Sequence, residues 1–427
     1  MQKMISLFIV CLFILVCSFV NCQDKEYASY IIKELSSPNF YGRSYYKKGL
    51  KKSEKFIINE LKRINSQNIK TQTLKYYVYV AKKTTLVLDG KVLNDGYDYI
   101  LFPTSKKNKG IFKTILVTKN NFDTLKKLTS KEPVFVLVDS TIQNDKFYKE
   151  ELIKIIENNK KEFGGYLFLK NKPISYKGYS GPQKRGIFKD IKKHVKIYNK
   201  TVGEVSYEFS EVKNLEIEFK PKRKKIRSKN IYTFKEGITD TIILFCGHYD
   251  HLGTFGKAYY PGANDNAAAI AMLLDIYKEI QNFKPYYTVY LVFFTGEEHG
   301  LLGSFYFVDN LPLDSSKLYL VINLDVIGSG EEGVYVVNGK VFSEIFEKIE
   351  KISQENSIDI QLKARGKANN SDHAPFFLKG YKALFFYSSG KTGPYHHPDD
   401  KFEELSLAKY NEIVKLMLLL TKKSLFY

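Results

Sequence analysis

The second half of the chain alternates runs of consecutive apolar residues with segments of helical character. The apolar runs are residues 241–246, 287–294, 318–324 and 383–387. Helices are predicted over 265–281 and 405–425, where apolar residues recur at helical spacing. Strands that are apolar throughout are typical of a parallel sheet covered on both faces. We therefore predict an α/β fold with a mostly parallel central sheet and helices on both faces.

The N-terminus has the pattern of an export signal. Lys3 is followed by a charge-free stretch over residues 4–20, which is shorter than the about 20 apolar residues that span a bilayer. We predict a signal peptide over 1–22, with a mature chain that begins at Gln23. The alternative is lipid modification of Cys22, which would attach the protein to a membrane. Either reading predicts an exported protein, periplasmic or extracellular.

Cysteine usage limits how the mature chain can be stabilised. Cys11, Cys17 and Cys22 lie in the predicted signal region, and Cys246 is the fourth and last cysteine. A mature chain with one cysteine has no intramolecular disulfide and no cysteine-based zinc site.

The middle of the chain differs from both ends. Residues 27–65 read as helical and 75–90 as strands. Residues 86–221 contain short β-like runs, at 115–118, 134–138 and 166–169, among lysine- and asparagine-rich segments without a cluster of catalytic residue types. We interpret 86–221 as an inserted α+β module within a larger domain made of 23–85 and 222–427.

The chain is strongly basic, with a formal net charge of +20, and its densest basic run is KPKRKKIRSK at 220–229. Such a charge can attract nucleic acid, anionic lipid or acidic substrates. No nucleic-acid-binding signature surrounds the run, so no nucleic-acid partner is expected and the run is interpreted as a solvated linker.

Histidine and acidic residues follow the ends of the predicted strands. Six of the seven histidines lie between residues 248 and 397. In an open α/β sheet, loops at the carboxyl ends of strands converge on one site. Imidazole and carboxylate groups are zinc ligands in hydrolases. Taken singly, each of these residues could instead serve a turn, a helix cap or the solvated surface. The residues are His248, Asp250, Asp265, Glu297, Glu298, Asp325, Asp372, His373, His396 and Asp400.

Six motifs occur in an order that resembles the M28 metallopeptidases, which are di-zinc aminopeptidases and their relatives. They are GHYDH (247–251), PGANDNAAA (261–269), TGEEHGLLGS (295–304), NLDVIG (323–328), SDHAPF (371–376) and YHHPDD (395–400). The resemblance covers about 230–427 and also includes 27–80, where residues 35–37 and 41–43 resemble the N-terminal segment of the family. The insert stands where many relatives carry a protease-associated domain.

The resemblance implies two zinc ions and a role for each site residue. Asp265 would bridge both ions, His248 and Asp325 would bind one, and Glu298 and His396 would bind the other. Three further residues would act in catalysis: Glu297 as general base for a water that bridges the metals, Tyr395 as an oxyanion donor, and Asp250 as the carboxylate that orients His248. A cis peptide is implied between Asp265 and Asn266. The remaining histidines of this half are interpreted as supporting or structural: His251, His299, His373 and His397.

One position departs from the family pattern. Some relatives carry an arginine just before the Ser-Asp-His motif, where this chain has Asn370 and the nearest arginine is Arg365. The resemblance implies an exopeptidase that removes N-terminal residues from peptides. Two alternatives stay open: a glutaminyl cyclase, which uses one zinc, and a non-catalytic binding module. The oligomeric state and the preferred N-terminal residue are left open.

Overall fold

The computed structural model describes residues 25–45, 48–128, 130, 132–158, 162–170, 198–206, 212–255 and 258–422. The predicted signal peptide and Cys22 lie outside these residues. Within the described ranges, we find no helix with both the length and the apolar character that a membrane crossing requires.

Four parallel strands form the centre of the main sheet, in the spatial order β16-β13-β9-β12. They are β9 (Ile242–His248), β12 (Thr288–Phe294), β13 (Leu318–Leu324) and β16 (Ala383–Ser389). The predicted strands and the α/β fold are therefore confirmed. Two strands that were not predicted extend one side: β14 (Gly333–Val337), antiparallel to β16, and β15 (Leu362–Ala364), parallel to β14.

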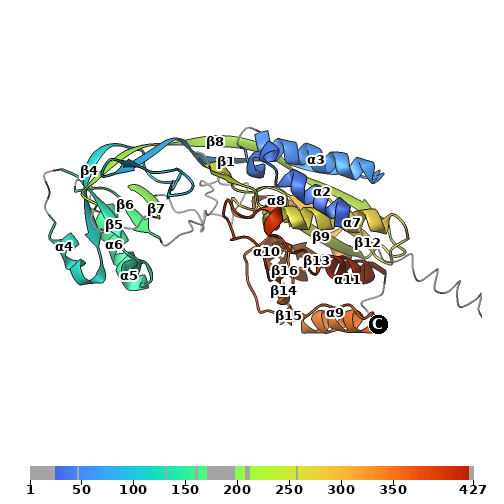
Figure 1. Ribbon diagram of the computed structural model, residues 1–427. Coiled ribbons are helices and arrows are strands. Elements are labelled where there is room, and N and C mark those ends of the chain that lie inside the picture. The colour runs from blue at the N-terminus through green and yellow to red at the C-terminus, as the bar shows by residue number, and fades with distance from the viewer. Residues whose placement is uncertain are drawn as a thin grey trace, which may run out of the picture.

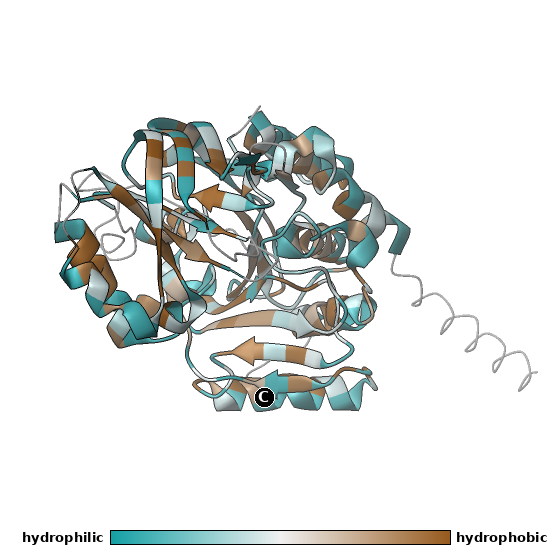
Figure 2. Ribbon diagram, turned by 60° about the vertical axis from the view of Figure 1, so that its left-hand side comes forward, coloured by the Kyte–Doolittle hydropathy of each residue, from teal (hydrophilic) through white to brown (hydrophobic). Residues whose placement is uncertain are grey.

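Helices cover both faces of this sheet. On one face α7 (Ala268–Ile280) packs against α2 (Lys25–Leu35) and α11 (Tyr410–Lys422), and α9 (Ser343–Glu355) packs against α11. On the other face α8 (Leu302–Asp309) contacts α10 (His373–Leu378). Figure 2 shows hydrophobic strands in the interior and helices that mix hydrophobic with hydrophilic residues.

Two predicted helices are shorter in the structure. The C-terminal helix begins at Tyr410, not at residue 405, because a turn with positive φ at Leu407 precedes it. The helix predicted from 265 begins at Ala268, because a tight π-type turn at Ala263–Ala267 places Asp265 and Asn266 outside helical φ/ψ. The peptide bond between Asp265 and Asn266 is cis, as the resemblance implies.

A long two-stranded ribbon replaces the linker that was predicted at 220–229. β1 (Lys70–Leu88) pairs along its length with β8 (Asn214–Lys235) in antiparallel register. The linker prediction was wrong because the run alternates: Ile226 and Ser228 are buried between exposed cationic side chains. In Figure 1 the ribbon joins a smaller unit to the larger one.

The smaller unit continues the main sheet through β4, which pairs with β8, and it has its own hydrophobic clusters. Its strands are β4 (Asn108–Val117), β5 (Val134–Val138), β6 (Phe163–Leu169), β7 (Thr201–Val205) and β3 (Tyr99–Leu101). The helices α4 (Asp123–Lys126), α5 (Ser140–Gln143) and α6 (Lys146–Asn158) accompany them. The short strand β2 (Lys91–Val92) pairs with the end of β1. In the larger unit, a separate short pair is formed by β10 (Gly253–Phe255) and β11 (Ala258–Tyr260).

Arg43 ties the N-terminal segment to the larger sheet. It ends the short helix η2 (Pro38–Arg43), which leads into α3 (Gly49–Arg63), and its side chain is fully buried. The guanidinium donates to five main-chain carbonyls at 2.6–3.1 Å, which belong to Leu35, Tyr249, Pro261, Gly262 and Asp265. All five N–H donors of an arginine are thus used. Arg43 therefore fixes the loop that carries Asp265.

We predict that Arg43→Met destabilises the metal-free protein by more than about 3 kcal/mol, because several buried carbonyls would lose their donor. The measurement is urea-induced unfolding in the presence of a chelator. Arg63→Met is the control, since the Arg63 side chain is 64% exposed and forms an ion pair with Glu60 in the same helix. A free energy of unfolding for Arg43→Met equal to that of the control would contradict this role.

Candidate metal centre

The structure brings all five predicted ligands together at the carboxyl ends of the parallel strands. His248 is the last residue of β9, Asp325 follows β13, and Glu298 lies in the turn after β12. Asp265 lies in the turn before α7, and His396 lies in the loop after β16. All five side chains are buried. The loops converge because parallel strands end at the same edge of the sheet.

On one side of Asp265, three ligand atoms face one another. His248 Nε2 lies 3.2 Å from Asp265 Oδ1 and 3.2 Å from Asp325 Oδ1. His248 donates from Nδ1 to the main-chain carbonyl of Asp250 at 3.1 Å, so Nε2 is the ring atom that would bind a cation. One nitrogen and two oxygens can therefore hold a cation here.

On the other side, His396 completes a second set. His396 Nε2 lies 3.0 Å from Asp265 Oδ2 and 3.4 Å from Glu298 Oε2. Asp265 thus presents one oxygen to each histidine, which is the arrangement that a carboxylate shared by two cations needs.

Glu297 borders the first set and differs from Glu298 in its surroundings. Its Oε2 lies 4.0 Å from His248 Nε2, and its side chain is 14% exposed against 4% for Glu298. Burial raises the pKa of Glu297 well above its ordinary value, and the charges of Glu298 and Asp325 add to this rise while His248 opposes it. A carboxylate with a raised pKa beside an open site is suited to accept a proton.

Asp250 lies beside both His248 and the turn that carries Glu297. Its carboxylate oxygen Oδ1 lies 4.0 Å from His248 Nδ1, and the closer partner of that nitrogen is the main-chain carbonyl of Asp250 itself. Oδ1 accepts a hydrogen bond from the main-chain N–H of Glu297 at 3.2 Å. The carboxylate therefore fixes the Glu297 turn, because the main chain already occupies His248 Nδ1.

Tyr395 stands at the mouth of the site. Its side chain is 59% exposed, and its ring stacks on His396 with 3.8 Å between ring centroids. Arg365, the arginine nearest in sequence to the Ser-Asp-His motif, lies over the Tyr387 ring and donates to the Tyr387 hydroxyl.

His251 is a site residue that the sequence analysis placed only in a supporting role. Its Nδ1 lies 2.7 Å from Glu298 Oε1 and 3.9 Å from Asp265 Oδ1. Its Nε2 is buried and has no hydrogen-bond partner in the part of the chain that the structure describes. Ligand atoms of His251, Asp265 and Glu298 lie within 4.8 Å of one another, as do those of His248, Glu297 and Asp325. In the sequence, the second histidine of the GHYDH motif was the feature that could have identified His251 as a site residue.

Further side chains hold these ligands in place. Ser371 donates to Asp325 Oδ2 at 2.6 Å and accepts from Asn323 at 2.7 Å. The Asp400 carboxylate accepts the main-chain N–H groups of Asn264 and Asp265.

The charge of this cluster requires a cation. The four carboxylates contact three imidazoles, those of His248, His251 and His396. Among the described residues, no lysine or arginine forms an ion pair with these carboxylates. Burial lowers the pKa of His248, but Asp325 and Glu297 outweigh this effect and raise it well above its ordinary value. Buried charges without compensation are costly, so the donor set fits divalent metal ions.

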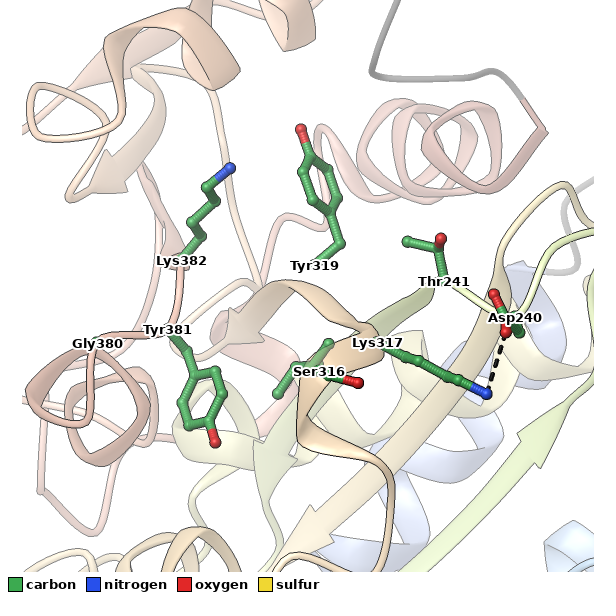
Figure 3. A pocket seen from close by; sticks show the side chains of 9 residues that line it. Asp240, Thr241, Ser316, Lys317, Tyr319, Gly380, Tyr381 and Lys382 are labelled. Carbon is green, nitrogen blue, oxygen red and sulfur yellow. Dashed lines mark ion pairs between the residues drawn. The ribbon is translucent and has the colours of Figure 1, made fainter.

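A separate pocket lies at the opposite end of the strands (Figure 3). It is lined at the amino ends of β9, β13 and β16, where Lys317 pairs with Asp240 at 3.0 Å. None of the predicted site residues lines it.

The region that contains these side chains matches a protein-family model. Residues 230–421 match the model described as Peptidase family M28. These residues contain every predicted ligand.

Curated relatives match parts of the same region. The chain is 28% identical over 176 residues to Aminopeptidase YwaD of Bacillus subtilis, which covers 39% of this chain and 37% of that protein. It is 32% identical over 162 residues to Leucine aminopeptidase 2 of Arthroderma otae, covering 35% and 31% respectively. The chain thus spans less than two thirds of the length of these relatives.

Solved structures match the fold over nearly the whole chain. A zinc aminopeptidase from Bacillus subtilis superposes with a TM-score of 0.67 at 18% identity, covering 92% of this chain and 93% of that one. An aminopeptidase from Aneurinibacillus sp. strain AM-1 gives 0.63 at 17% identity, with 93% of each chain covered. Residues 230–421 thus resemble peptidase family M28, and the fold over nearly the whole chain is similar to that of these two structures.

Proposed function

We propose that this protein is an exported, zinc-dependent exopeptidase that uses two zinc ions to remove N-terminal residues from peptides. The observation that carries the proposal is the pair of ligand sets that share Asp265, each with one histidine and one further carboxylate. The names of the similar proteins, which are aminopeptidases, agree with it.

The five ligands divide between the two ions in this proposal. His248 and Asp325 would hold one zinc, and His396 and Glu298 the other, with Asp265 shared. When bound, zinc supplies Lewis acidity toward a peptide carbonyl and lowers the pKa of a bound water. His251 would fix the orientation of Glu298 through its 2.7 Å contact.

Glu297 would act as the general base. Its raised pKa and its place beside His248 suit it to take a proton from the attacking water and pass it to the leaving amine. The hydrogen bond from its main-chain N–H to Asp250 would hold the turn in position. Tyr395, exposed at the mouth of the site, would donate its hydroxyl to the developing oxyanion.

The remaining features of the proposal concern export and the insert. The mature chain would begin at Gln23 or at a lipid-modified Cys22. The unit formed by 86–221 would act as a protease-associated-type domain that shapes access for substrates without contributing metal ligands.

The direct test is a screen of aminoacyl reporter substrates and peptides. We expect release of N-terminal residues, loss of this activity with a chelator, and its recovery on addition of zinc. An enzyme that instead cyclises an N-terminal glutamine peptide, or one that binds peptides without turnover, would contradict the proposal.

Two matched variants separate the proposed base from a proposed ligand. Glu297→Gln should lower turnover by about 10²–10⁴-fold while the zinc content stays unchanged, because only basicity is removed. Glu298→Gln should first lower the zinc content. Elemental analysis and initial rates on the same preparations measure both effects, and near-normal turnover of Glu297→Gln with full zinc would refute the assignment of the base.

A further inference from the structure

The ribbon of β1 and β8 carries a concentrated positive charge. Neither β1 nor residues 219–235 of β8 contain an acidic residue. Between Lys220 and Arg227, six of eight side chains are cationic, and all six are exposed. β4 pairs with β8 only up to Phe219 and β12 only from Ile231, so the described strands leave the intervening ribbon two-stranded.

The register sorts these charges onto two faces. Residues directly opposite in an antiparallel pair share a face. Tyr77 lies opposite Lys225 and Lys75 opposite Arg227, which places these cations on one face. Val78 lies opposite Lys224 and Val80 opposite Lys222, which places these two lysines on the other.

The face with Lys222 and Lys224 is the one that reaches the metal centre. Tyr76 lies on this face, and its ring centroid is 6.0 Å from that of His299, the residue after Glu298. Tyr45 lies 6.4 Å from the same histidine ring, and Lys224 Nζ lies 5.3 Å from the Tyr45 ring. The lysines therefore continue a surface that begins at the turn carrying the proposed base.

We propose that Lys222 and Lys224 form a subsite for acidic residues of the peptide substrate, downstream of the bond that is cut. This inference rests on the proposed exopeptidase function. The first peptide bond would lie at the metal centre, and the later residues would extend along the ribbon toward the smaller unit.

The positions of Lys224 and Lys222 along β8 determine which substrate residues they would contact. Lys224 lies four residues along β8 from Ser228, whose hydroxyl is 3.4 Å from the Tyr76 hydroxyl. Four strand residues span about 13 Å, which equals the length of about four residues of an extended peptide. With the cut bond placed level with Ser228, acidic side chains at the fifth to seventh positions of a substrate would meet Lys224 and Lys222.

The test uses peptides that share their first four residues and carry Glu, Gln or Lys at positions five to seven. For the wild-type enzyme we expect kcat/KM to be about tenfold higher for the Glu peptide than for the Gln peptide, with the difference in KM. The preference should shrink at high salt, because exposed charges are screened. The double variant Lys222→Glu/Lys224→Glu should abolish or invert it.

The matched control is Lys225→Glu/Arg227→Glu, which changes the net charge equally on the opposite face. The control should keep the preference for Glu peptides, and both variants should hydrolyse a short aminoacyl reporter at the wild-type rate. Equal wild-type rates for Glu and Gln peptides would overturn the subsite and leave the lysines as protection of an open strand edge. An equal loss in both variants would also overturn it, and a wild-type enzyme inactive on every reporter would overturn the proposed function as well.

Discussion

The structure depends on the burial of several carboxylates at one edge of a parallel sheet, where no lysine or arginine among the described residues forms an ion pair with them. Asp265, Glu297, Glu298 and Asp325 converge there, and the fully buried Arg43 nearby donates to main-chain carbonyls and not to these carboxylates. Such a cluster is costly unless metal ions compensate its charge. We therefore expect metal binding to stabilise the fold, because the ion that would serve the chemistry would also relieve the repulsion.

The scaffold around the cluster consists of neutral or charge-assisted hydrogen bonds that fix loops from different strands. Arg43 holds the carbonyl side of the loop with Asp265, and Asp400 holds its N–H side. Ser371 holds Asp325, and the Asp250 carboxylate holds the Glu297 turn. Each contact joins residues far apart in the sequence, so the ligand geometry is a property of the whole fold.

The sequence predicted the parts of this arrangement that leave a strong local pattern. The four buried strands are continuous apolar runs, and the ligand types at their ends stood out because each follows such a run. The strand at 220–229 was not predicted, because cationic residues dominate the run and only two of its positions, Ile226 and Ser228, show the alternation of buried and exposed side chains. The contact of His251 with Glu298 and the hydrogen bond from His248 to the Asp250 carbonyl could not be predicted from sequence spacing, since they depend on how the loops meet in space.

The central claim is that two zinc ions lie on either side of Asp265, and anomalous diffraction at the zinc edge from a zinc-loaded crystal tests it most directly. We predict two peaks per chain, one bounded by His248 and Asp325 and the other by His396 and Glu298. A single peak, or a peak coordinated by His251 in place of His396, would contradict this account.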